Sequence, residues 1–178
     1  MSDASLPVVT IVVLVITVFV TALHAVVPGL LPALRRNPDA LSTDEWWRLF
    51  TPLFVQADPW WATLSVFVGI FVVGVAVERT YGHRDWLALY FGGGVVGELA
   101  GYAWQPHGSG ASVAGAGLLG GLSVWLLWRG NSVPLGVRVW GPIWLAVGVL
   151  LTLLHDIHGP PLLFGACLGA MLLWRERN

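Results

Sequence analysis

Long uncharged stretches of apolar residues dominate this chain and restrict it to a lipid environment. Residues 4–34 contain no Asp, Glu, Lys or Arg, and similar stretches recur along the chain. Charged residues make up only 11% of the 178 residues, whereas soluble domains carry about 25%. The chain therefore cannot cover a water-facing surface with polar groups. This excludes a cytosolic globular protein, a disordered chain and a nucleic-acid-binding protein.

The apolar stretches predict an all-α membrane protein, a six-helix bundle in a single domain covering residues 1–178. A membrane span needs about 20 residues, and the stretches show no period-2 alternation, so helices are favoured over a closed barrel. Pro28 is expected to end or kink the first span. The predicted spans are 7–34, 60–77, 86–104, 112–128, 139–154 and 158–174.

The distribution of the nine arginines predicts the orientation of the bundle. Loops rich in Arg and Lys stay in the cytoplasm. With six spans, both termini lie on one side, together with Arg79, Arg84, Arg129, Arg138, Arg175 and Arg177. The other side holds Arg35, Arg36 and Arg48. We therefore expect a multi-pass protein with both termini in the cytoplasm.

Two polar residues stand out against the apolar background, Ser112 and His158. Ser112 opens a predicted helix, where unpaired backbone N–H groups and the helix dipole can stabilise an oxyanion. A histidine within hydrogen-bond reach can accept the proton of a serine hydroxyl. Taken alone, the two residues fit equally simple roles, a helix cap and a turn residue.

The spacing around Ser112 adds a resemblance to a known family. Gly117 and Gly120 follow Ser112 at the offsets found in the fourth helix of the rhomboid family of intramembrane serine proteases, which this sequence resembles. The resemblance covers roughly residues 40–175. It also rests on a Trp-Arg loop pair (Trp47, Arg48), a Gly-x-x-x-Glu-x-x-x-Gly pattern (Gly74, Glu78, Gly82), and His158 followed by Gly165.

The resemblance implies an endopeptidase that cleaves transmembrane helices near the outer membrane face. Ser112 would be the nucleophile and His158 its general base, in a dyad without an acid. The implied partners are a transmembrane protein substrate and the lipid bilayer, with no cofactor, metal, nucleotide or nucleic acid. Asp156 is expected to cap the turn before His158, with orientation of a histidine as the alternative.

Several positions depart from the family pattern. Val113 stands where the family has Gly, and it is expected to crowd a helix contact. Trp61 and Ser65 fall on the family positions of a His and an Asn near the oxyanion, and Ala116 replaces an aromatic residue. Gln56 falls on a more distal family histidine. The oxyanion candidates are Ser112, Gln56 and Ser65.

These departures keep other hypotheses open. One is a catalytically weak or inactive rhomboid-like protein that binds transmembrane helices. Ser109 and His155 are alternative choices for nucleophile and base. A further hypothesis is a small transporter or metal site built from Glu98, His107, His155, Asp156 and His158. For Glu98, which lies within a predicted span, pairing with a polar neighbour is the favoured interpretation.

Overall fold

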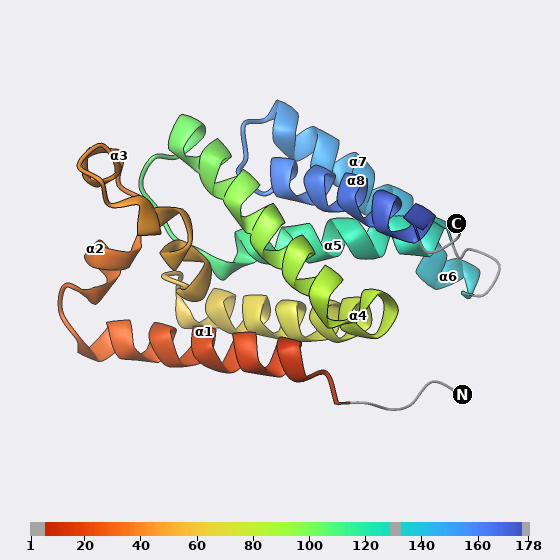
Figure 1. Cartoon of the computed structure of the whole chain (residues 1–178), viewed down its shortest axis with the longest axis horizontal. Helices are drawn as coiled ribbons and strands as arrows, with labels where there is room; N and C mark the ends of the chain where they lie inside the picture. The colour runs from red at the N-terminus through yellow and green to blue at the C-terminus, as the bar shows by residue number, and fades with distance from the viewer. Residues whose placement is uncertain (1–5, 129–132, 176–178) are drawn as a thin grey trace.

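The computed structural model describes residues 6–128 and 133–175, and every regular element in those ranges is a helix (Figure 1). This confirms the predicted all-α class. The elements are α1 (Val8–Val26), α2 (Leu30–Leu34), α3 (Pro38–Leu41), two short 3-10 helices η1 (Trp46–Leu49) and η2 (Thr51–Phe54), α4 (Trp60–Trp104), α5 (Ala111–Trp128), α6 (Leu135–Arg138), α7 (Trp140–Leu153) and α8 (Gly159–Arg175).

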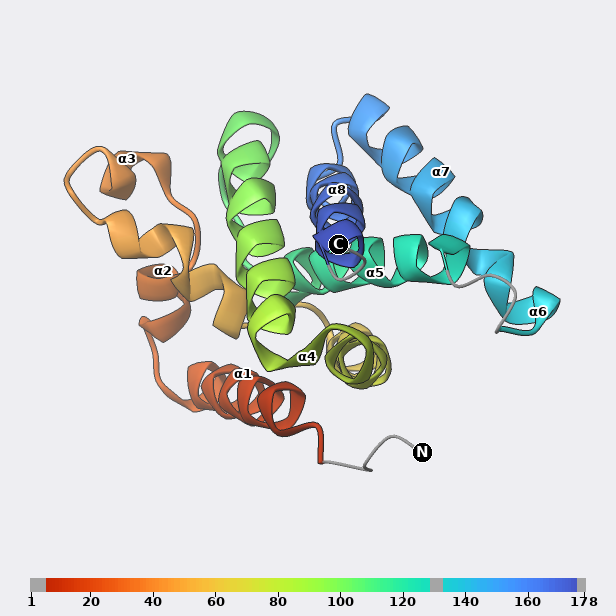
Figure 2. The same ribbon diagram turned by 45° about the vertical axis from the view of Figure 1, so that its right-hand side comes forward.

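The long element α4 consists of two arms that meet at Gly82. Gly82 has φ 79° and ψ 175°, a backbone conformation that only glycine adopts without strain. The chain reverses there, and the arm of residues 83–104 returns beside the rest of the bundle (Figures 1 and 2). The indole nitrogen of Trp86 donates to the Gly74 carbonyl at 3.1 Å and joins the arms across the reversal.

The helix bounds differ from the predicted spans by more than one residue at two places. The first span ends at Val26 rather than residue 34, because Pro28 stops the helix and Gly29 turns the chain at φ 87° into α2. The arms of α4 extend beyond the predicted limits to the reversal at Gly82. Charged Glu78 does not end the first arm, since its carboxylate is buried against α1.

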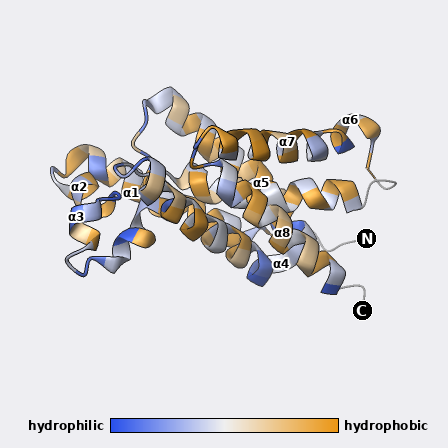
Figure 3. Cartoon of the chain, turned by 90° about the horizontal axis from the view of Figure 1, so that it is seen from above, coloured by the Kyte–Doolittle hydropathy of each residue, from blue (hydrophilic) through white to orange (hydrophobic). Residues whose placement is uncertain are grey.

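Most residues of the helices are apolar, and hydrophilic residues gather around α2 and α3, with others near α4, α6 and the C-terminal end (Figure 3). On α1, for example, Val15 and Phe19 are 61% and 65% exposed. In the described ranges, α1, α4, α5 and the stretch 135–153 are long and apolar enough to cross a membrane. The count of six spans stays a prediction. It requires each arm of α4 to cross once and the 17-residue α8 to cross as well.

Helix α5 lies at the centre of the bundle and packs against α4, α7 and α8 (Figure 2). The contacts are made at glycines, where a side chain would not fit. A Cβ on Gly117 would strike the Leu89 carbonyl of α4, and one on Gly120 would strike the Leu162 carbonyl of α8. Gly165 of α8 in turn lies against the Gly117 carbonyl. Such close backbone contact is how helices associate in lipid.

Glu78 fastens α1 to the bundle. Its carboxylate accepts hydrogen bonds from the backbone N–H groups of Val9 and Thr10, at 2.9 and 2.7 Å, and from the Thr10 hydroxyl at 2.6 Å. These N–H groups belong to the first turn of α1 and have no partner within the helix. Gly74, one turn before Glu78, leaves room for the Thr10 side chain. In the predicted motif, Gly74 and Glu78 therefore hold α1 against α4, and Gly82 allows the chain to reverse.

Two buried arginines order the connection between α1 and α4. Arg48 of the Trp-Arg pair donates to the carbonyls of Pro32 and Arg35, both at 2.8 Å, and pairs with Glu45. Its neighbour Trp47 is 43% exposed.

The second arginine, Arg36, lies 2.8 Å from Glu98 in an ion pair whose side chains are 2% and 0% exposed. The Arg36 backbone N–H also donates to the Gly108 carbonyl. Arg36 thereby joins the connection to the α4–α5 loop. This pairing agrees with the structural interpretation of Glu98.

Replacing Glu78 by Ala is expected to lower the stability of the protein by about 1–3 kcal/mol, because the first turn of α1 loses its acceptor. Thermal unfolding of the purified protein in detergent measures the change. Asp85→Ala is the matched control, since Asp85 pairs with exposed Arg175 at the long distance of 3.5 Å, and we expect less than about 0.5 kcal/mol there. Equal effects of the two substitutions would contradict the role assigned to Glu78.

Arg36→Met is expected to destabilise the protein by about 3–5 kcal/mol, since it leaves the Glu98 carboxylate buried without its partner. The double variant Arg36→Met/Glu98→Met removes both charges and should recover most of that loss. Thermal unfolding of the single and double variants provides the comparison. A double variant no more stable than Arg36→Met would show that the pair does not couple the two residues.

Candidate active site

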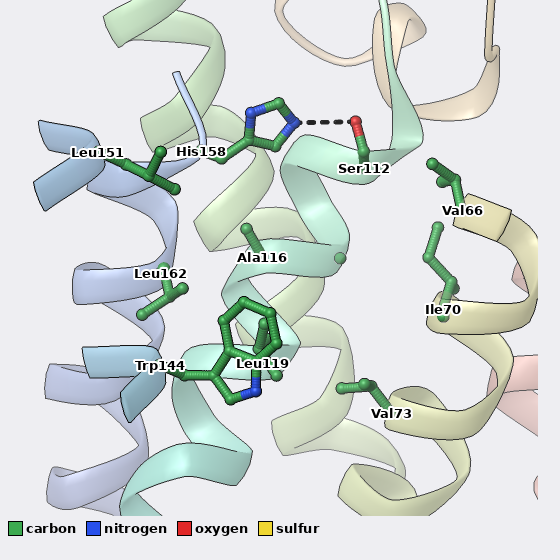
Figure 4. Close-up of a pocket in the computed structure, with 12 residues that line it drawn as sticks. Val66, Ile70, Val73, Ser112, Ala116, Leu119, Trp144, Leu151, His158 and Leu162 are labelled. Carbon is green, nitrogen blue, oxygen red and sulfur yellow. Dashed lines mark hydrogen bonds between the residues drawn. The ribbon is translucent and has the colours of Figure 1, made fainter. Parts of the chain in front are cut away.

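Ser112 and His158 meet at one end of the bundle. Ser112 lies in the first turn of α5, and its Oγ is 3.1 Å from Nε2 of His158, which directly precedes α8 (Figure 4). The distance is within the reach needed for direct proton transfer. The two residues are 46 positions apart in the sequence. Their proximity therefore depends on the packing of α5 against α8.

A third polar residue completes this group. Oδ1 of Asp156 accepts from His158 twice, from the ring nitrogen Nδ1 at 2.7 Å and from the backbone N–H at 2.9 Å. In the structure, the expected pair of Ser112 and His158 therefore has a carboxylate beside it. The turn cap favoured for Asp156 is present, and so is the alternative contact with the histidine ring. An aspartate two residues before a histidine is the sequence signal for such a turn.

The surroundings of Asp156 keep it ionised. Burial opposes its ionisation, but the hydrogen bonds and charge of His158 outweigh burial and hold the pKa of the Asp156 carboxyl below its usual value. A lowered pKa means that the charged form is favoured in the folded state. The contacts of the carboxylate with His158 are then fully present above the ordinary aspartate pKa. They are lost only as the pH falls through the lowered pKa.

Gln56, an oxyanion candidate, lies beside Ser112. It is 2% exposed, and its Oε1 accepts the backbone N–H of Ser112 at 3.4 Å. Its Nε2 donates to the carboxylate of Asp58. The structure thus brings together two of the three oxyanion candidates, with the Gln56 amide oxygen facing the N–H of Ser112.

Ser65, the third oxyanion candidate, lies elsewhere. Its hydroxyl is exposed and donates to the Ala62 carbonyl of its own helix at 2.7 Å. Trp61 is likewise 76% exposed. The first arm of α4 is rotated so that Val66, Gly69, Ile70 and Val73, rather than Trp61 or Ser65, line the cavity at Ser112. Sequence alignment along the arm did not determine this rotation.

A cavity of about 460 Å³ extends from Ser112 and His158 into the bundle, between the first arm of α4, α5 and α7 (Figure 4). Apart from Ser112 and His158, its lining is almost entirely apolar. The other lining residues are Val66, Gly69, Ile70, Val73, Gly115, Ala116, Leu119, Trp144, Leu151 and Leu162. The small residues at positions 115 and 116 leave the space below the serine open.

Val113 fits at the position where crowding was expected. Its side chain is 1% exposed and occupies the space beside Gly97 of α4, where a Cβ would strike it. Pro161 and Ile157 lie near the same glycine. A branched residue on α5 is thus accommodated by a glycine on the facing helix.

The alternative residues have other neighbours. The ring of His155 makes an edge contact with the indole of Trp104, with centroids 5.1 Å apart. Glu98 is paired with Arg36. Two members of the transporter or metal-site hypothesis are therefore engaged elsewhere. Ser112, rather than Ser109, is the serine that contacts His158.

Comparison with known proteins gives a consistent family match. A family model described as the Rhomboid domain matches residues 43–177. YdcA of Bacillus subtilis (strain 168), a protein assigned to the rhomboid proteases, is 31% identical over 136 residues, covering 74% of this chain and 68% of YdcA.

Two other relatives match over shorter stretches. Rhomboid protease GluP of the same bacterium is 36% identical over 83 residues, covering 46% of this chain and 16% of GluP. Rhomboid-like protease 3 of Toxoplasma gondii is 36% identical over 86 residues, covering 47% of this chain and 32% of that protein. This chain therefore belongs to the rhomboid family, as its motifs indicated, and is a multi-pass integral membrane protein.

Proposed function

We propose that this protein is an intramembrane serine endopeptidase that cleaves transmembrane-helix substrates near the outer membrane face. The observation that carries the proposal is the 3.1 Å contact between Ser112 Oγ and His158 Nε2, in a chain whose relatives are named as rhomboid proteases. A polar pair of this kind inside a membrane protein is expensive to maintain without a function.

The proposed reaction begins with proton transfer from the Ser112 hydroxyl to Nε2 of His158 as Oγ attacks the substrate carbonyl carbon. The tetrahedral intermediate collapses, and His158 returns the proton to the leaving amide nitrogen. Water then attacks the acyl-enzyme ester, again with His158 as base, and releases the acid with Ser112 regenerated. Each step uses side chains of this chain and one water molecule.

The oxyanion of each tetrahedral intermediate needs a hydrogen-bond donor. The backbone N–H of Ser112, at the start of α5, is one such donor, and the helix dipole adds to it. In the resting arrangement this N–H points to Oε1 of Gln56. Release of that bond, or a half-turn of the Gln56 amide that presents Nε2, makes donors available to the substrate oxygen.

The apolar cavity below Ser112 supports a substrate taken from the membrane. Its volume of about 460 Å³ accommodates a large apolar side chain next to the cleaved bond. Backbone carbonyls in a helix are hydrogen-bonded within it, so the substrate must unwind locally to reach Ser112. Residues with low helix propensity near the membrane surface ease this step.

The outward location of the site rests on the arginine distribution. Of the three arginines on the Ser112 side, Arg36 and Arg48 are buried in ion pairs with Glu98 and Glu45. The side of the termini holds the other six of the nine arginines, and loops rich in Arg stay in the cytoplasm. We therefore place both termini in the cytoplasm.

A second candidate function is binding of transmembrane helices without efficient cleavage. Trp61 and Ser65 do not line the cavity at Ser112, so the site lacks two side chains at the positions where the family resemblance places oxyanion groups. Loss of a single oxyanion donor lowers kcat by about 10²–10³-fold. The two functions share the cavity but differ in turnover.

Ser112→Ala is expected to abolish cleavage of a fluorescent transmembrane peptide in liposomes, lowering kcat by at least about 10³-fold. It should also abolish labelling by a fluorophosphonate probe, which reacts with activated serines. Ser109→Ala, three residues earlier, is the matched control and should keep both signals. Identical products from wild type and Ser112→Ala would rule out the protease. Peptide binding without cleavage in both would favour the helix-binding function.

Ala116→Phe is expected to fill the cavity and change substrate selection. Peptides with Leu or Phe before the cleaved bond should lose kcat/KM by roughly 10–200-fold relative to peptides with Ala there. The kcat/KM values for the three peptides measure the effect. Ala146→Phe, on an exposed part of α7, is the control and should leave the ratio unchanged. An unchanged ratio in Ala116→Phe would show that the cavity does not hold that side chain.

A further inference from the structure

We propose that Asp156 is a positioning residue for the reaction, holding the His158 ring so that its Nε2 faces Ser112. This inference rests on the proposed function and extends the serine–histidine pair to a group of three. The observation that carries it is the double contact of one carboxylate oxygen with His158, at the ring nitrogen and at the backbone.

The two contacts hold both the main chain and the ring of His158. The backbone bond of 2.9 Å places the main chain of His158 over the Asp156 carboxylate. The ring bond of 2.7 Å then sets the rotation of the imidazole. With both bonds made to Oδ1, the ring has little freedom to turn, and Nε2 is directed toward Ser112, as Figure 4 shows.

The turn that carries Asp156 is itself fixed to the helices around it. The Asp156 N–H donates to the Leu151 carbonyl of α7 at 2.9 Å, and the Asp156 carbonyl accepts from Gly159 of α8 at 3.2 Å. His155 adopts φ 57° just before it. The carboxylate is therefore held by the junction of two helices.

The ring contact also selects the tautomer that the chemistry needs. A carboxylate only accepts, so Nδ1 of His158 must carry a proton to bind it. The neutral ring then has a free lone pair at Nε2, which is the atom that receives the proton of Ser112. An imidazole without this contact carries its single proton on either nitrogen, and one of the two forms cannot act as base.

A cap alone would not require the ring contact. A residue that only caps the start of α8 needs the backbone bond to His158, as in any Asx turn. The bond to Nδ1 is additional and shorter. Substitutions that separate the two bonds therefore distinguish a cap from a positioning residue.

The test compares Asp156→Ala and Asp156→Asn with wild type and Ser112→Ala, each as the whole 178-residue chain in liposomes with the fluorescent peptide. Asparagine keeps an acceptor oxygen for the backbone N–H of His158 but replaces the carboxylate by an amide that can also donate to Nδ1, whereas alanine loses both bonds. His155→Asn is the control in the same turn, because asparagine tolerates positive φ. The measurements are kcat, KM, fluorophosphonate labelling rate and thermal unfolding.

We expect Asp156→Ala to lower kcat and the labelling rate on the order of 10²-fold with little change in KM, a smaller loss than the ~10⁴-fold known for a buried triad aspartate. The smaller figure reflects the exposure of the Asp156 side chain, 37%. Asp156→Asn should keep the turn cap but lose kcat to a similar extent, because its amide can donate to Nδ1 and hold the ring in the tautomer that has no free lone pair at Nε2. His155→Asn should match wild type.

A spectroscopic readout separates positioning from folding. Nitrogen NMR of protein labelled with ¹⁵N-histidine reports which ring nitrogen of His158 carries the proton. We expect protonation at Nδ1 in wild type, and a shift toward Nε2 in both Asp156→Asn and Asp156→Ala. The His158 resonances are assigned by their loss in His158→Gln.

Wild-type kcat in Asp156→Ala would overturn the proposal, and so would an unchanged His158 tautomer. A fall in thermal stability with unchanged kcat would leave only the cap. If Ser112→Ala still cleaves the peptide, the proposed function fails instead, and the NMR comparison still decides whether Asp156 sets the tautomer. The two failures are therefore distinguishable.

Discussion

The close approach of helix backbones at glycine residues is the constraint on which the rest of this structure depends. Helices in lipid gain no hydrophobic stabilisation from one another, so they associate through tight van der Waals contact. Gly117 of α5 lies against Leu89 of α4, and Gly165 of α8 lies against Gly117. These contacts fix the relative height of α5 and α8, and the ends of the two helices bring Ser112 and His158 together.

A second constraint acts on the connection between α1 and α4. A buried charged group loses its hydration at a large cost in free energy, so it needs a partner of opposite charge. Arg36 and Glu98 satisfy this requirement together, and the backbone of Arg36 also binds Gly108 in the loop before α5. The connection is thereby held over the start of α5, where Gln56 reaches the N–H of Ser112. A structural ion pair thus shapes the site without taking part in it.

The departures from the family pattern at Val113 and Ala116 are explained by their neighbours in the bundle. Val113 adds volume on α5, and Gly97 on α4 leaves the space that it fills. Ala116 opens the cavity beneath Ser112 where the resemblance places an aromatic ring. The His158 ring is instead held from its other side, by Asp156. The Ser112–His158 contact is therefore the one that the family resemblance implies, whereas the residues around the two side chains differ from the family pattern.

The sequence by itself determined the membrane environment, the helical class and the family, because long apolar stretches allow little else and short motifs mark Ser112, Glu78 and His158. It also predicted a break at Pro28, though not the early end of α1 at Val26. Only the tertiary structure decided the rotation of each helix. That rotation leaves Ser65 outside the lining of the cavity at Ser112, and a turn between two helices brings Asp156 to the ring. The physical reason is that periodicity fixes which residues share a face, whereas contacts between helices fix where that face points.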